Sequence, residues 1–196
     1  MKGKLITLTL LTLFCFNNFS YSQKKTKPMH FDKVVWFGVD FTAAKLTLVP
    51  DDPETIVHQY FKEINVLILT EPEKFNIKKY FNIKEVSNNI ESVNEFNEKI
   101  NPSSLVSYID FKIDTNQVKN VINKYHSTDN SGTGLILVAE NLNKASKQAS
   151  YYVCFFNIET KKIIDIKRMV GSVSGFGFRN YWARTIYNVM LQWDPY

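Results

Sequence analysis

The sequence predicts a single α+β domain in which a mostly antiparallel sheet is covered by helices packed on one face. Two apolar segments, 150–158 and 162–170, are separated by a three-residue turn, which is typical of a β-hairpin. Apolar residues recur at helical spacing in 56–68 and in 178–193. The chain has 196 residues, and removal of a leader of 22 leaves 196 − 22 = 174. At ~150 residues per domain, this length corresponds to about one domain.

Residues 1–22 have the pattern of a signal peptide. Two lysines precede the apolar run 5–16, and small residues then predict cleavage between Ser22 and Gln23. A run of that length reaches only ~18 Å as a helix, short of a hydrocarbon core of about 30 Å. We therefore expect an exported protein, periplasmic or secreted, with a retained or lipidated anchor as the alternative. No later segment predicts a membrane span.

The composition is that of an ordinary globular protein, with 44% apolar and 22% charged residues. It excludes a disordered, collagen-like or coiled-coil chain. Cleavage of the leader leaves one cysteine, Cys154, so an internal disulfide framework is excluded as well. The net charge of +5 comes from scattered lysines. With export, this distribution argues against a nucleic-acid partner.

The predicted elements begin with a flexible basic arm at 23–33, which precedes the domain at 34–196. An apolar strand is expected at 34–41. Asp52 and Pro53 then form a helix start, because a carboxylate can cap and proline suits the first helical position.

The middle of the chain is harder to assign, and its topology over 74–105 stays open. A strand is possible in 78–86 and a helix in 89–100. A turn at 101–104 and a short strand at 105–111 follow, and Asp114 or Thr115 caps a further helix.

The C-terminal third predicts a strand at 134–139, a polar connection at 140–147 and then the hairpin. A glycine-rich segment, 171–177, leads into the closing helix at 178–193.

No catalytic constellation is found. The histidines at 30, 58 and 126 are not spaced as zinc ligands. The sequence Gly-Ser-Val-Ser-Gly at 171–175 has valine where a nucleophile elbow needs serine. Cys154 lies in an apolar run that suits a buried strand, whereas a nucleophilic thiol needs an electropositive setting. We expect no enzyme activity, no metal and no cofactor.

The order of elements resembles a known exported domain. A first strand ending Val-Asp-Phe at 39–41, a strand beginning Gly-Leu-Ile at 134–136 and the Glu-Thr-Lys turn at 159–161 carry the resemblance. It is similar to the small α/β domain of curli-secretion lipoproteins and the TolB N-terminal domain, and to uncharacterised periplasmic proteins. The resemblance implies an envelope assembly or interaction module without a catalytic site. The chain lacks the lipid-anchoring cysteine of the curli relatives.

The function expected from these observations is protein binding or assembly in the cell envelope, with an envelope protein as partner. Glycines let a backbone approach a partner closely, and Tyr, Trp and Arg are common interface anchors. The binding candidates are therefore Gly175, Gly177, Arg179, Tyr181, Trp182 and Arg184. The alternative is a small-molecule or lipid carrier with an apolar pocket between sheet and helices, lined by Phe155, Tyr152 and Trp36.

Overall fold

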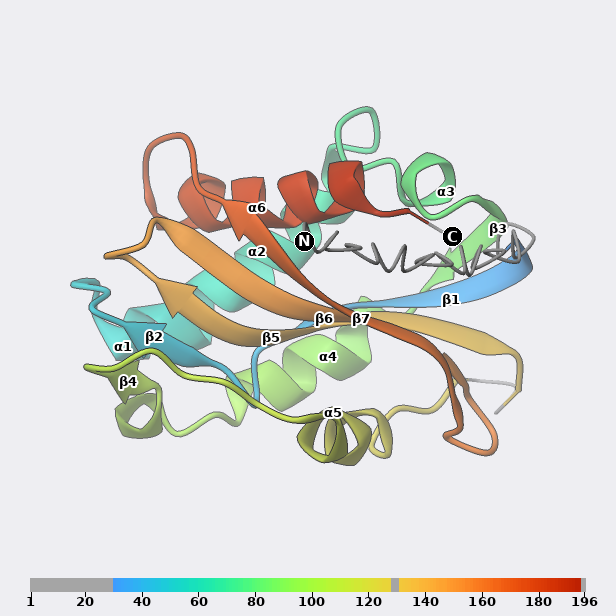
Figure 1. Ribbon diagram of the computed structural model, residues 1–196, viewed down its shortest axis with the longest axis horizontal. Coiled ribbons are helices and arrows are strands. Elements are labelled where there is room, and N and C mark those ends of the chain that lie inside the picture. Colours follow the sequence, from blue (N-terminus) through green and yellow to red (C-terminus); the bar gives the residue numbers. More distant parts are fainter. Residues whose placement is uncertain (1–29, 128–130, 195–196) are drawn as a thin grey trace, which may run out of the picture.

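The computed structural model describes residues 30–127 and 131–194 (Figure 1). The predicted signal peptide and most of the predicted arm lie outside the described residues. Strand β1 begins at Phe31, inside the range predicted as arm. Among the described residues, no helix is long and apolar enough to cross a membrane.

In the described part of the chain, seven strands form one sheet around the long central strand β5. The strands are β1 (Phe31–Asp40), β2 (Lys45–Thr47), β3 (Ile83–Asn88), β4 (Val106–Ser107), β5 (Thr133–Asn143), β6 (Gln148–Asn157) and β7 (Ile163–Ser172). Strand β1 lies along the first half of β5 and β2 along its last three residues, both on the same edge. Strand β6 pairs with the other edge of β5, and β7 pairs with β6.

The prediction of a mostly antiparallel sheet is wrong, because the protein has an α/β fold with a mostly parallel central sheet. The pairings β1–β3, β1–β5, β2–β4 and β2–β5 are all parallel. The antiparallel pairings of the described residues are β5–β6 and β6–β7. Helical connections separate β1, β3 and β5 along the chain, and a connection of that kind returns the next strand in the same direction.

The helical segments surround this sheet. They are α1 (Pro53–Thr55), a π-helical turn η1 (Ile56–Tyr60), α2 (Phe61–Thr70), α3 (Ile77–Tyr80), α4 (Ile90–Glu98), a 3₁₀ turn η2 (Pro102–Ser104), α5 (Thr115–Ile122) and α6 (Phe178–Gln192). The predicted caps are confirmed: the side chain of Asp52 accepts a hydrogen bond from the Thr55 N–H, and Asp114 forms a capping box with Gln117.

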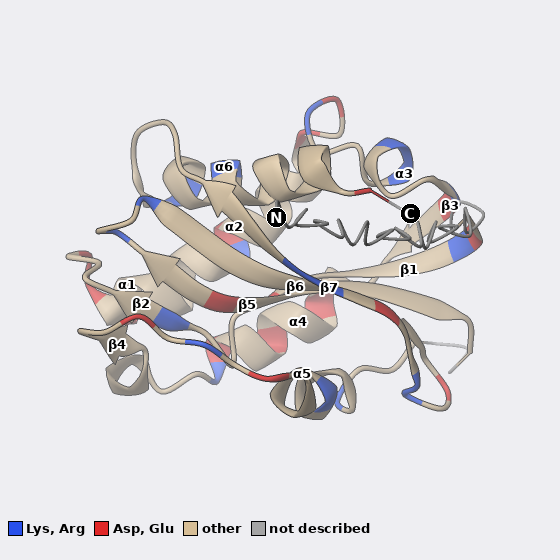
Figure 2. Cartoon of the chain, in the orientation of Figure 1, with Lys and Arg blue, Asp and Glu red and all other residues tan. Residues whose placement is uncertain are grey.

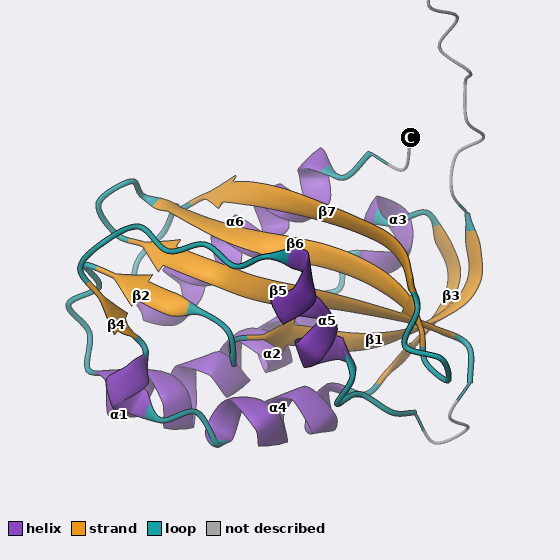
Figure 3. Cartoon of the chain, turned by 60° about the horizontal axis from the view of Figure 1, so that its bottom comes forward, coloured by secondary structure: helices purple, strands orange, loops and turns teal. Residues whose placement is uncertain are grey.

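Helices cover both faces of the sheet, so the prediction of helices on one face is also wrong (Figure 3). The Tyr151 hydroxyl is 2.7 Å from the Thr185 hydroxyl of α6. The hydroxyl of the next residue, Tyr152, donates to the carbonyl of Ile113, which precedes α5. Neighbouring residues of a strand point to opposite faces, and α5 and α6 therefore lie on opposite sides of the sheet.

The predicted hairpin is confirmed as β6 and β7, and the predicted closing helix is confirmed as α6. The predicted strand at 105–111 reduces to the two residues of β4. The predicted connection at 140–147 is partly wrong, because β5 continues to Asn143 and buries Glu140 and Asn141.

The side chains of Asn65 and Asn97 complete the hydrogen bonding of β1. Pairing with β3 ends at Trp36, and beyond it the amide of Asn65 in α2 accepts from the Val39 N–H at 2.7 Å and donates to the Val39 carbonyl at 3.1 Å. Gly38 has φ 97°, and a Cβ at this position would lie 2.7 Å from the Asn65 Oδ1 atom. A glycine is therefore required where α2 approaches β1.

Candidate functional site

The predicted glycine loop connects β7 to α6 and projects from one end of the sheet (Figure 1). Gly175 and Gly177 both have a positive φ, of 102° and 72°. Between them Phe176 is 95% exposed. Sequence analysis missed Phe176, although an aromatic residue between two glycines is a readable signal, since such a loop has little around it to bury the ring.

The aromatic candidates of the first turn of α6 differ in their exposure. Tyr181 is half-buried, and the Lys144 Nζ atom lies 3.9 Å from the centroid of its ring, within the range of a cation–π contact. Trp182 is 1% exposed and belongs to the hydrophobic core. Of these two side chains, Tyr181 is therefore the one that a partner can reach.

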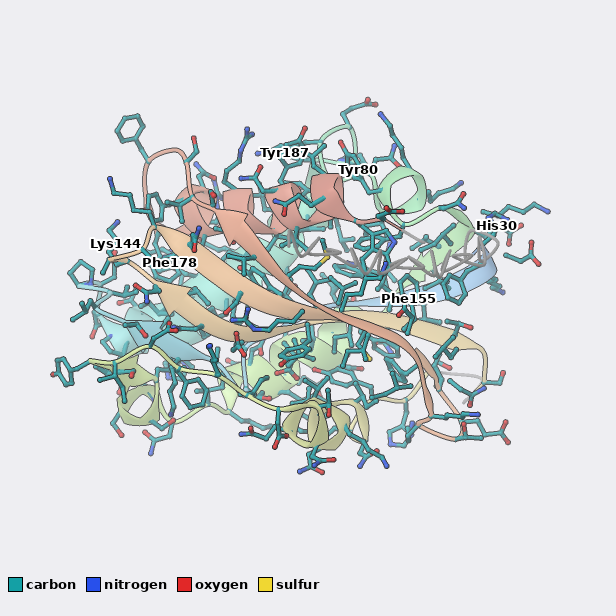
Figure 4. The ribbon with its side chains drawn as sticks, viewed as in Figure 1. His30, Tyr80, Lys144, Phe155, Phe178 and Tyr187 are labelled. Carbon is teal, nitrogen blue, oxygen red and sulfur yellow. The ribbon has the colours of Figure 1, made fainter. Side chains whose placement is uncertain are left out.

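The two candidate arginines do not share one surface with the loop. The Arg184 guanidinium lies 4.8 Å from the centroid of the Tyr187 ring, and Figure 4 shows Tyr187 beside Tyr80, away from Phe178 and Lys144. Arg179 lines a shallow cleft of about 230 Å³ against α2. The structure thus brings together the two glycines and Tyr181, and it directs the arginines elsewhere.

Three backbone hydrogen bonds place the glycine loop in a row with other strand ends. The Leu48 N–H donates to the Ser107 carbonyl at 3.2 Å, which joins the ends of β2 and β4. The Lys144 N–H donates to the Thr47 carbonyl at 2.9 Å, which joins the β5–β6 turn to β2. The Val173 N–H donates to the carbonyl of Lys147 in the same turn at 3.1 Å. Four segments from distant parts of the chain therefore form one continuous end of the sheet.

This end of the sheet carries most of the exposed large apolar side chains. Of the eight such side chains in the described residues, five belong to three of these four segments, and the β5–β6 turn contributes none. We call them the strand-end surface: Leu48, Val106, Tyr108, Ile109 and Phe176. In Figure 2 the β7–α6 connection has no charged residue, and lysines mark the neighbouring β5–β6 turn. Exposed apolar side chains that gather at one end of a sheet are typical of an interaction site.

The segment that carries Tyr108 and Ile109 is fixed to the sheet. Residues 108–114, here called the strap, have no regular secondary structure and run from β4 to α5. The Thr47 hydroxyl donates to the Ile109 carbonyl at 3.1 Å. The Asn141 side chain donates to the Asp110 carboxylate at 2.7 Å.

A buried carboxylate holds the far end of the strap. Glu140 is 0% exposed, and its Oε1 atom accepts from the Ile113 N–H at 3.0 Å. Its Oε2 atom accepts from the Arg168 Nε at 2.8 Å and also from Nη2. Both oxygens of Glu140 thus have partners, one in the strap and one on β7. Tyr108 and Ile109 project from a backbone that is already ordered, and a preordered surface loses less entropy on binding.

Other clefts contribute less to a site. A cleft of about 520 Å³ near the start of β5 is lined partly by Lys33 and Glu91, but it borders residues 128–130, which lie outside the described part of the chain, and we base no site on it. A polar cleft of about 310 Å³ lies beside the strap, with Asp110 and Arg168 in its walls. The side chains of Asp110 and Arg168 already bind Asn141 and Glu140.

The histidines lie apart from one another. His30 is near Asp32, and His58 in the π-helical turn η1 is 3.3 Å from Glu54 of α1, one turn away. Within residues 30–127 and 131–194, no group of three or more His, Cys, Asp or Glu side chains is arranged to hold a metal ion.

Cys154 is buried in β6, and burial raises the pKa of its thiol to about 12, from 9.0. The folded state therefore keeps the proton that the unfolded chain loses above pH 9. We expect the free energy of unfolding to fall by about 1.4 kcal/mol per pH unit from this group as the pH rises from 9 toward 12. Urea unfolding at about pH 8 and about pH 10.5 measures the loss. The Cys154→Ala variant should have a shallower dependence, and equal slopes would contradict the assignment.

No protein-family model, curated protein or solved structure matches the chain. The resemblance to curli-secretion lipoproteins and the TolB N-terminal domain therefore stays a prediction, and a function has to be inferred from the residues of this structure.

Proposed function

We propose that this protein is a non-catalytic, protein-binding module, and that the strand-end surface is where it contacts its partner. The observation that carries the proposal is a set of five exposed apolar side chains at one end of the sheet. One follows β2, three lie in or just after β4, and one lies in the glycine loop, which backbone hydrogen bonds join to β2 through the β5–β6 turn. Two of the five, Tyr108 and Phe176, are aromatic and more than four-fifths exposed. Aromatic side chains of this kind are enriched among the residues that contribute most binding energy.

The position of this surface fits a general property of parallel sheets. Strands β2, β4 and β5 end here with their carboxyl ends, and open α/β sheets bind outside the carboxyl ends of their strands. The loops of this end are the part of the fold that can vary without disturbing the core.

The side chains predicted to line an apolar carrier pocket pack against other residues instead. The Phe155 ring stacks on the Phe31 ring with centroids 4.3 Å apart and lies 5.6 Å from the Trp193 ring. Trp36 is fully buried. This packing favours binding on the surface over binding in a pocket between sheet and helices. The signal peptide predicted at 1–22 makes an envelope protein the expected partner.

A photo-crosslinking amino acid placed at Tyr108 or Phe176 is expected to capture one partner of defined mass in the native cells. Val66 and Leu191 are the matched control positions, because both are exposed apolar residues outside the strand-end surface. Mass spectrometry of the adduct identifies the partner. Equal capture at the control positions, or none at Tyr108 and Phe176, would contradict the proposal.

The Tyr108→Ser, Phe176→Ser double variant then tests the energy of the contact. We expect the affinity for the identified partner to fall by more than about tenfold, which is the loss typical of aromatic anchors. The melting temperature should not change, because both side chains lie in solvent. The Arg179→Ala variant serves as the control on the same helix, and we expect it to bind normally.

A further inference from the structure

Strand β7 forms a free border of the sheet (Figure 3). It is ten residues long, and among the described residues it pairs only with β6. An unpaired strand edge presents backbone N–H and C=O groups that can pair with another strand. Proteins protect such edges with charged side chains and bulges, and β7 has Asp165 and Lys167 along it and a bulge between Ile163 and Asp165.

Two charged side chains of β7, those of Asp165 and Lys167, lie on one face of the strand. Asp165 is opposite Phe155 in the β6–β7 pairing, and the Phe155 ring packs against Trp193, which follows α6. The Lys167 Nζ atom lies 4.6 Å from the centroid of the same Trp193 ring and also donates to the Asp194 carbonyl, which leaves further N–H donors of the ammonium for another acceptor. Asp165 and Lys167 therefore both point to the α6 side of the sheet. The carboxylate of Asp165 makes no hydrogen bond or ion pair with another described residue.

The order of these charges is complementary to itself. When two copies of β7 pair antiparallel around a two-fold axis at Ile166, residues on the same face meet, and Asp165 of each copy lies opposite Lys167 of the other. Directly opposed side chains have Cβ atoms about 5 Å apart, and opposite charges there are favourable. Moving the axis by one residue sets two Asp165 side chains or two Lys167 side chains against each other, which is unfavourable. The charges thus select one register.

We propose that two copies of this chain associate through antiparallel pairing of their β7 edges, centred on Ile166. The interface is isologous, so each Asp165–Lys167 contact occurs twice, and the two sheets continue into one. The Arg168 side chain lies on the opposite face, where it binds Glu140 of its own chain. The proposal does not depend on the strand-end surface, and failure of either proposal leaves the other standing.

Light scattering after size-exclusion chromatography tests the dimer with the purified protein. We expect twice the mass of one chain at micromolar concentration. The Asp165→Lys variant places two like-charge pairs in the interface and should raise the dissociation constant by at least about tenfold. Lys167→Asp should do the same, and the double variant Asp165→Lys, Lys167→Asp should restore the wild-type dissociation constant because the pairs are exchanged.

Two control variants change the charge equally outside the strand. Glu159→Lys and Lys162→Asp lie in the exposed β6–β7 turn, and we expect both to dimerise normally. Circular dichroism and the melting temperature verify that each variant is folded. A wild-type monomer at every concentration would overturn the proposal, as would a dimer that tolerates Asp165→Lys. A double variant that stays monomeric although it is folded would also overturn it, because the register predicts rescue.

Discussion

Replacement of Arg168 by leucine is expected to destabilise the protein by about 3 kcal/mol. The variant removes the cation that binds the carboxylate of Glu140, a side chain with 0% exposure. A buried carboxylate without its cation is costly, because its lost hydration is no longer replaced. The Arg168 side chain itself is 38% exposed, so water can partly reach the vacated position, and we expect the lower part of the range known for broken buried pairs.

A double-mutant cycle separates the charge from the packing. The Glu140→Gln variant keeps an oxygen that can accept from the Ile113 N–H but removes the negative charge. We therefore expect Glu140→Gln together with Arg168→Leu to be clearly more stable than Arg168→Leu alone, as measured by urea unfolding. If the double variant is the less stable one, the buried charge is not the cause. The Glu140→Leu variant, which removes the acceptor of the Ile113 N–H, should also release the strap, and amide hydrogen exchange at Ile113 would detect this.

Local structure was largely readable in the sequence, because the signals for it are local. Asp52 and Asp114 cap their helices as predicted, and the spacing in 178–192 identified α6. The hairpin was also found, because both of its strands and its turn are adjacent in the chain. The pairing of β1, β3 and β5 was not found, since nothing within a strand states which distant strand lies beside it.

The candidate site was harder to predict for the same reason. Glu140 and Asn141 read as a polar connection, yet both are buried, because Arg168 and the strap supply partners from distant parts of the chain. Tyr108 and Ile109 read as residues of a strand, and their exposure follows only from the path of the strap. Among the predicted candidates, the glycine loop lies on the strand-end surface. It does so because the β5–β6 turn bonds to it on one side and to the end of β2 on the other.

Asparagine residues at 65 and 97 present a second case in which long-range partners decide the role of a polar side chain. Asn97 of α4 is 1% exposed, accepts from the Phe41 N–H at 2.8 Å and donates to the Val39 carbonyl at 3.0 Å. Together with Asn65 it provides side-chain amides where the pairing of β1 with β3 has ended. A side-chain amide matches a peptide group, because it has one acceptor and a donor in a similar arrangement.

The Asn97→Leu variant is therefore expected to lose about 2–4 kcal/mol of stability, although leucine has a similar size and is more apolar. The gain from a more apolar side chain is smaller than the cost of leaving the Phe41 N–H without a partner in the core. Asn65→Leu should have a similar effect through the Val39 N–H. Asn94→Ala is the matched control, because Asn94 contacts Asn65 but makes no hydrogen bond to β1, and we expect a loss below about 1 kcal/mol. Chemical unfolding measures the free energy of unfolding of all three variants. If Asn97→Leu loses no more stability than Asn94→Ala, the end of β1 does not depend on these amides.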